Sequence, residues 1–209
     1  MQALLLIDLQ NDFMPTGSLP VADGDSVVPV ANRVIAALSG DAIIVATQDW
    51  HPANHGSFAT QHAGKSPGEL VKLGGVDQVL WPDHCVQLSH GAQLHTELDS
   101  RKIEKLFFKG TDVGIDSYSA FFDNGHLRAT GLADWLRLRG VRDIVTLGLA
   151  TDFCVKFSVL DALELGFRVT LVSDGCRGVN LQAGDSERAI AEMAERGARV
   201  VESSALLSA

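Results

Sequence analysis

The chain lacks the features of several large classes of protein. Its three cysteines are too few, and odd in number, for a disulfide framework, which favours a reduced, cytoplasmic protein. Its 17 basic residues are outnumbered by 26 acidic ones, so we expect neither a nucleic-acid nor an anionic-membrane surface. No apolar run approaches the roughly 18 residues that cross a membrane. The apolar run near the first residue has no basic segment before it, and Asp8 ends it too early for a signal peptide, so we do not expect one.

What the chain does have is the composition of an ordinary globular protein. Hydrophobic residues make up 46% and charged residues 21% of its 209 residues, enough for a core that needs no disulfide or metal. It contains no internal repeat, low-complexity tract or linker-like stretch. We therefore expect a single domain over residues 1–209.

Short apolar runs alternate along the chain with amphipathic segments. The runs are continuous, which is typical of parallel strands buried on both faces. They occupy residues 3–7, 42–47, 105–109, 143–149, 168–172 and 198–202. The amphipathic segments, expected to form helices, lie near residues 26–39, 130–139, 152–165 and 184–196. This order predicts an α/β fold, a three-layer αβα sandwich around a mostly parallel sheet of about six strands.

Four reactive side chains lie at or just after the ends of predicted strands. They are Asp8, Asp49, Lys109 and Cys154. Because open α/β sheets bind ligands at the carboxyl ends of their strands, we expect these side chains to meet at one edge. The irregular stretch of roughly residues 48–104 is too long for an ordinary connection and is predicted to be a functional flap.

Cys154 is the candidate nucleophile. It falls in the first turn of the helix predicted over 152–165, for which Thr151 or Asp152 is the candidate N-cap and Gly166 the stop signal. The free N–H groups and the dipole of a helix start favour a thiolate, and those N–H groups can also stabilise an oxyanion.

A cysteine nucleophile needs a proton acceptor, and Asp8 is the candidate because no histidine outside the flap lies near a strand end. The ammonium of Lys109 would hold the aspartate and favour negative charge on sulfur or oxygen. Cys85 and Cys176 are interpreted as structural residues.

Asp49 and His51 form a second cluster with His84. Residues two apart in an extended chain point to the same side, so Asp49 and His51 can share one ion. Two imidazoles and a carboxylate suit Zn²⁺, Fe²⁺ or Mn²⁺. The other histidines are interpreted as surface or loop residues, with His55 a candidate neighbour of the ligands: His55, His62, His90, His95 and His126.

Six segments carry a resemblance to a known family. They are IDLQNDFMPTGSLPV (7–21), TQDWHPANHGSF (47–58), LWPDHCVQ (80–87), FFKGTD (107–112), DSYSAFFDN (116–124) and LGLATDFCVKFSVLDA (147–162). In this order, and over nearly the whole chain, the sequence resembles the nicotinamidase (pyrazinamidase) branch of the isochorismatase-like cysteine hydrolases.

The resemblance implies a catalytic triad of Asp8, Lys109 and Cys154. It also implies an oxyanion hole formed by the backbone N–H groups of Ala150 and Cys154, with a cis peptide between Leu149 and Ala150. The substrate-binding side chains that it implies are Phe13, Leu19, Trp81 and Tyr118.

The resemblance further implies that Asp49, His51 and His84, within the flap, bind one divalent metal ion. Zinc is the first expectation, with iron and manganese as alternatives. Some relatives have a further histidine or glutamate ligand, but the aligned residue here is Ser57, so water is expected to complete the metal's ligands.

The activity implied is hydrolysis of nicotinamide, and of pyrazinamide, through a cysteine thioester in NAD salvage. Three alternatives stay open: a cysteine amidase for ureido or carbamoyl substrates, a non-catalytic metal-binding relative, and a thiol redox sensor, which no C-x-x-C motif supports. The expected partner is a small molecule, and association between copies of the chain is left open.

Overall fold

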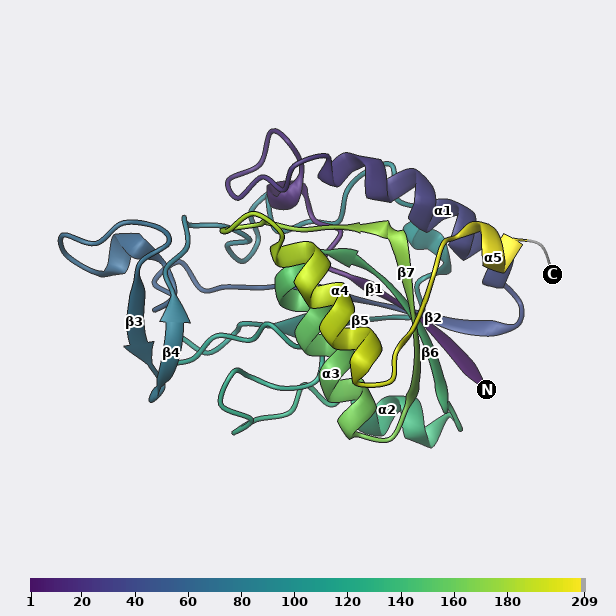
Figure 1. Cartoon of the computed structure of the whole chain (residues 1–209). Coiled ribbons are helices and arrows are strands. Elements are labelled where there is room, and N and C mark those ends of the chain that lie inside the picture. Colours follow the sequence, from purple (N-terminus) through teal and green to yellow (C-terminus); the bar gives the residue numbers. More distant parts are fainter. Residues whose placement is uncertain (208–209) are drawn as a thin grey trace.

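A six-stranded parallel sheet forms the centre of the computed structural model, which describes residues 1–207 (Figure 1). The strands lie in the order β5-β2-β1-β6-β7-β8. Their bounds are Gln2–Ile7 (β1), Ala42–Asp49 (β2), Lys105–Lys109 (β5), Asp143–Leu149 (β6), Arg168–Arg177 (β7) and Arg199–Val201 (β8). Each predicted strand is present, so the apolar runs located the sheet correctly.

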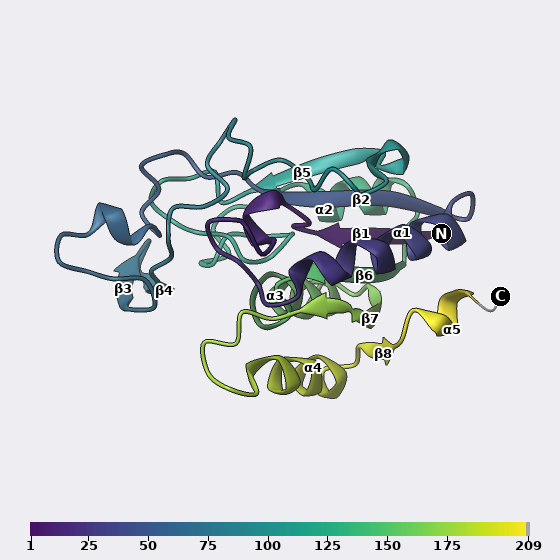
Figure 2. The ribbon, with the colours of Figure 1, turned by 90° about the horizontal axis from the view of Figure 1, so that it is seen from above.

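Helices cover both faces of this sheet and complete the predicted three-layer fold (Figures 1 and 2). The helix α1 lies on one face with α5, and α2, α3 and α4 lie on the other. Their bounds are Val27–Leu38 (α1), Leu132–Leu138 (α2), Lys156–Glu164 (α3), Asp185–Glu195 (α4) and Ser204–Leu207 (α5). Short 3₁₀ segments occupy Asn11–Phe13, Gly24–Ser26, Ala59–Gln61 and Ser100–Lys102. Among the described residues, no helix has the length and apolar character needed to span a bilayer.

The parallel register brings the carboxyl ends of four adjacent strands, β5, β2, β1 and β6, to one edge of the sheet. Asp49, the last residue of β2, lies directly opposite Lys109, the last residue of β5. On the other side of β1, Ile7 pairs with Gly148 near the end of β6, and Asp8 follows Ile7. Because these strands end at the same edge, Asp8, Asp49 and Lys109 are neighbours.

The flap lies beyond that edge and contains a hairpin of its own. Strands Leu70–Leu73 (β3) and Val76–Val79 (β4) pair antiparallel and are separate from the main sheet (Figures 1 and 2). The flap is also tied to the first loop of the chain, since the Cys85 amide donates to the Asp12 carboxylate at 2.6 Å. The strands of the hairpin are too short to have shown a clear period in the sequence.

The start of the helix that carries Cys154 differs from the prediction. Residues Thr151–Val155 form a π-helical turn before α3, and neither predicted cap closes it with its side chain. The carboxylate of Asp152 instead accepts the amides of Val179 (2.9 Å) and Asn180 (2.7 Å) across the loop after β7.

Cys176 also corrects the sequence interpretation. It lies inside β7, not in a loop after a strand. It is buried, as a structural cysteine should be.

We predict that Gly148→Ala lowers the free energy of unfolding by about 3–5 kcal/mol, because a β-carbon there would collide with the backbone of Ile7 on β1. Gly140→Ala is the matched control, since that glycine also has a positive φ (71°) but has no atom within 4 Å of the added carbon. The control should lose only about 1–2 kcal/mol in urea denaturation. Equal losses in the two variants would show that the close approach of β1 and β6 is unimportant.

Candidate active site

The ammonium of Lys109 is the centre of the site. Its Nζ lies 2.9 Å from Asp8 Oδ2 and 3.3 Å from Cys154 Sγ, and it donates to the Ser117 carbonyl oxygen at 3.1 Å. It also donates a hydrogen bond to Asp49 Oδ1. The side chain of Lys109 has no exposed surface. One buried cation thus contacts both the predicted nucleophile and the predicted base.

Burial controls the protonation of the two groups beside this ammonium. It raises the pKa of Asp8 to about 6, although the charge of Lys109 and the hydroxyl of Thr47 act to lower it. Burial also raises the pKa of the Cys154 thiol well above its ordinary value, with the Asp8 and Asp49 charges adding to the effect and Lys109 opposing it. Near pH 7 the aspartate is therefore mostly ionised and the thiol protonated.

The Cys154 thiol keeps its proton at rest, because the loss of solvation outweighs the charge of Lys109. The thiol needs a base, and the ionised Asp8 lies beside it: ligand atoms of Asp8, Asp49 and Cys154 all lie within 4.8 Å of one another.

Ala150 precedes the π-helical turn and lines the same cavity as Cys154. The expected cis peptide between Leu149 and Ala150 is present. The oxyanion hole formed by the N–H groups of these two residues stays a prediction.

Next to the predicted triad, ligand atoms of Asp49, His51 and His84 lie within 4.8 Å of one another, close enough to hold one metal ion. The Nε2 atoms of His51 and His84 lie 3.8 Å and 3.9 Å from Asp49 Oδ2. Each ring's Nδ1 lies 2.8 Å from a backbone carbonyl oxygen, that of Gly110 for His51 and that of Pro82 for His84. A neutral ring can only donate to such an oxygen, so Nδ1 carries the proton and Nε2 offers its lone pair. These residues fit a divalent cation.

The charges of this cluster suit the same role. Burial lowers the pKa values of His51 and His84, so both rings are neutral near pH 7. Burial alone would favour a protonated Asp49, but the neighbouring positive charge, that of Lys109 first, outweighs it and lowers the pKa of Asp49. A carboxylate and two neutral imidazoles are the protonation states that bind metal.

The position of His55 differs from the prediction, since a surface location was expected from its place in a loop. It is fully buried, with its ring centroid 4.3 Å from that of His51. Its Nδ1 lies 2.7 Å from the hydroxyl oxygen of Ser57, and its Nε2 has no hydrogen-bond partner among residues 1–207. The neighbour role expected for His55 fits this position, and the hydroxyl of Ser57 is engaged with His55.

The four side chains expected to hold a substrate line one cavity that also reaches the reactive groups. Around it lie Phe13, Leu19, Asp49, Trp81, His84, Asp116, Tyr118, Ala150, Phe153, Cys154 and Val179. The indole N–H of Trp81 donates to the Tyr118 hydroxyl at 3.2 Å, and the Gln78 amide donates to the same oxygen at 2.9 Å. The aromatic walls are therefore held in fixed positions.

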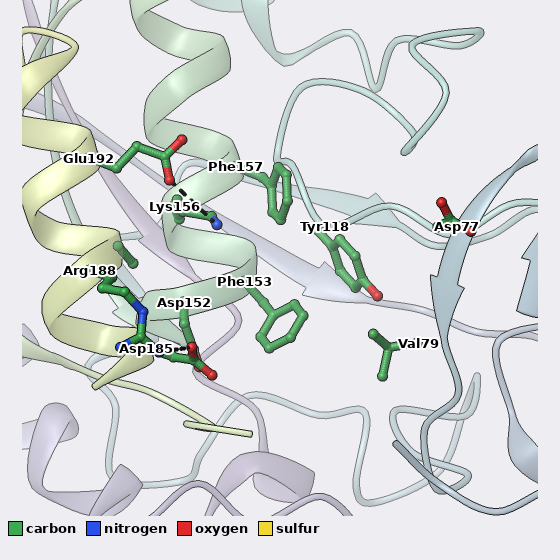
Figure 3. A pocket seen from close by; sticks show the side chains of 11 residues that line it. Asp77, Val79, Tyr118, Asp152, Phe153, Lys156, Phe157, Asp185, Arg188 and Glu192 are labelled. Carbon is green, nitrogen blue, oxygen red and sulfur yellow. Dashed lines mark hydrogen bonds and ion pairs between the residues drawn. The ribbon is translucent and has the colours of Figure 1, made fainter. Parts of the chain in front are cut away.

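An outer cavity of about 460 Å³ shares the rings of Tyr118 and Phe153 with this inner one. Figure 3 shows both rings and that of Phe157 between the hairpin and the helices α3 and α4. On the helix side, Lys156 pairs with Glu192 at 3.7 Å and Arg188 with Asp185 at 2.6 Å, whereas the Asp152 carboxylate accepts two backbone amides. The charged groups on this side of the outer cavity therefore already have partners.

Sequence reasoning missed three buried polar residues around the site. Thr47 binds Asp8, and Asp116 lines the cavity near the histidines. Gln10 accepts the backbone N–H of Asp49 and donates to its carbonyl oxygen, both at 2.8 Å. Gln10 and Asp116 lie in the segments that carry the resemblance, but nothing in their spacing indicated these contacts.

Comparison with known proteins places the chain in a family. The family model described as "Isochorismatase domain" matches residues 2–205. The chain belongs to the isochorismatase family.

Among its relatives, the nicotinamidase of Escherichia coli K12 is 56% identical over 199 residues, which covers 94% of this chain and 92% of that protein. A solved Acinetobacter baumanii nicotinamidase/pyrazinamidase superimposes with a TM-score of 0.94 at 41% identity, covering 99% and 98% of the two chains. The pyrazinamidase of Pyrococcus horikoshii, solved in complex with zinc, gives a TM-score of 0.78 at 37% identity, with 96% and 98% covered.

We predict that His51→Ala and His84→Ala each lose bound metal, because each removes one of two imidazole ligands. Elemental analysis of the purified proteins measures this directly, and substrate affinity should weaken along with metal content. His90→Ala is the matched control, since His90 is exposed and lies outside the cluster. Full metal occupancy in the first two variants would contradict the proposed ligand set.

Proposed function

We propose that this family member hydrolyses nicotinamide to nicotinate and ammonia, and pyrazinamide to pyrazinoate, through a thioester on Cys154. The observation that carries the proposal is the single buried ammonium of Lys109 in contact with Asp8, Cys154 and Asp49. The identity of 56% to a nicotinamidase supports the choice of substrate. The reaction serves NAD salvage.

In the first half of the reaction, Asp8 takes the proton of the Cys154 thiol, and the sulfur adds to the amide carbon. The N–H groups of Ala150 and Cys154 hold the oxyanion that develops on the amide oxygen. Lys109 stays protonated, because Asp49 and Asp8 raise its pKa against the effect of burial, and its charge stabilises the thiolate as it forms.

In the second half, Asp8 returns the proton to the nitrogen of the leaving group, so that ammonia departs and a thioester remains. Asp8 then takes a proton from water, whose oxygen adds to the thioester carbon. As the C–S bond breaks, Asp8 gives that proton to the sulfur, so the thiol is restored and the product acid is released. Asp8 thus acts as base and acid in the first step, and as base and acid again in the second.

In this scheme the flat aromatic ring of the substrate is bound by four side chains, those of Phe13, Leu19, Trp81 and Tyr118. Asp49, His51 and His84 hold a divalent cation, with zinc the first expectation, since a related pyrazinamidase was solved with zinc. When bound, that ion supplies a Lewis-acid contact that orients the ring. The chain forms one domain, and its flap over residues 48–104 carries the metal site. Its substrate is a small molecule, and the enzyme works in the cytoplasm.

We predict that Cys154→Ala abolishes ammonia release from nicotinamide, while Cys85→Ala and Cys176→Ala keep it. All three cysteines are free and buried, so the variants match in chemistry and in the space they leave. Ammonia release from the unmodified chain, with and without a chelator, tests the proposed function itself. Turnover by Cys154→Ala together with inactivity of Cys176→Ala would place the nucleophile elsewhere.

We predict that kcat/KM falls as the pH drops through about 6, the raised pKa of Asp8, because only the ionised carboxylate accepts the thiol proton. Activity is therefore present above this pKa and lost below it. Asp8→Asn keeps the shape but cannot carry a proton, so its kcat should fall by about 10²–10⁴ with little change in substrate affinity. A flat profile between pH 5 and 7, measured with metal in excess, would remove Asp8 from this role.

A further inference from the structure

Thr47 makes two contacts with the same residue, Asp8. Its hydroxyl oxygen accepts the backbone N–H of Asp8 at 3.3 Å, and its hydroxyl donates to Asp8 Oδ1 at 2.6 Å. Both residues have no exposed surface. Strand pairing brings the two residues together. Thr47 lies on β2, which pairs in parallel with β1, and Asp8 directly follows the end of β1.

The first contact stabilises an unusual backbone conformation at Asp8. Asp8 has a φ of 50°, a left-handed conformation that residues other than glycine seldom adopt. A buried N–H in such a turn needs an acceptor, and Thr47 supplies it. The single hydroxyl group of Thr47 thus holds both the backbone and the side chain of Asp8 in place.

The second contact distinguishes the two carboxylate oxygens. A hydroxyl has a single proton to donate, and the proton of Thr47 goes to Oδ1. Asp8 Oδ2 forms an ion pair with the Lys109 ammonium at 2.9 Å, and it has no hydrogen-bond partner among residues 1–207. Oδ2 is therefore the oxygen that is free to take a proton.

We propose that Thr47 is a positioning residue for the catalytic base. Its hydroxyl fixes the Asp8 carboxylate beside Cys154, since an oxygen of Asp8 and the Cys154 sulfur lie within 4.8 Å of each other. The proton released when the S–H bond breaks then goes to Oδ2, the oxygen that Thr47 leaves without a hydrogen bond. The proposal rests on the function proposed above, in which Asp8 is the base for Cys154. Thr47 itself touches neither the substrate nor the sulfur in this scheme.

The test removes the hydroxyl while keeping the shape. In Thr47→Val, kcat for nicotinamide should fall about 10- to 100-fold with KM changed less than about 3-fold, because the base is displaced and the ring-binding walls are not. Thr47→Ser retains the hydroxyl and should keep kcat within about 3-fold of the unmodified chain. A serine variant as slow as the valine variant overturns the proposal, since the methyl group would then be what matters.

Thr146→Val is the matched control. Thr146 is a buried threonine on β6, the other neighbour of β1, and its hydroxyl donates to the Leu5 carbonyl oxygen at 3.0 Å. Its loss removes a similar hydrogen bond from the same strand without touching Asp8, so kcat should stay within about 2-fold. An equal loss in Thr146→Val overturns the proposal, because general damage to the core would explain both variants.

A second readout needs no nicotinamide. Iodoacetamide alkylates Cys154 only as the thiol loses its proton, so Thr47→Val should slow this reaction in proportion to kcat, while Thr47→Ser and Thr146→Val should not. Alkylation is followed by mass spectrometry of the Cys154 peptide, and metal content is measured on each protein. An unchanged alkylation rate in Thr47→Val, or metal lost in parallel with its activity, overturns the proposal.

The two proposals fail in different ways. If the unmodified chain does not release ammonia from nicotinamide, the proposed function fails, and the alkylation rates still decide the role of Thr47. If Thr47→Val does not fold, Thr47→Ala removes the same hydroxyl. Slow alkylation in Thr47→Ala beside a normal rate in Thr47→Ser supports the proposal, and equal rates overturn it.

Discussion

The buried ammonium of Lys109 is the interaction on which the rest of this site depends. A cation without contact to water is stable only if anions surround it, and Asp8 and Asp49 fill that need from two different strands. The same ammonium lies against the sulfur of Cys154. The proposed acid–base pair and the proposed metal ligands are therefore parts of one electrostatic unit, and removing either carboxylate would leave the Lys109 ammonium with one neighbouring anion in place of two.

The parallel sheet makes that unit possible with little help from loops. The ends of β2 and β5 lie side by side, so Asp49 and Lys109 meet as strand partners, and Asp8 follows β1 beside them. Cys154 comes from the turn after β6, on the far side of β1. His51 and His84 come from the part of the flap that follows β2, and this irregular stretch packs onto the edge of the sheet at the site.

The fold and most of the site were predictable because each follows from a pattern that the chain displays. Continuous apolar runs indicate parallel strands, and the reactive residues lie where those runs end. What could not be predicted depends on contacts between distant segments. Asp152 is a plausible cap in sequence, but Val179 and Asn180 compete for its carboxylate. His55 is in a polar loop, and only folding buries it against His51. The balance of burial and charge at Cys154 likewise exists only in three dimensions.

The two carbonyl oxygens that hold His51 and His84 have a consequence for how the proposed metal site would gain and lose an ion. Gly110 and Pro82 set both rings from the backbone, and Gln10 holds the backbone of Asp49, so the ligands keep their arrangement through the fold itself. Chelation should then leave a folded protein that can be reloaded without passing through an unfolded state. Metal supply in the cell, more than folding, would set the fraction of active molecules.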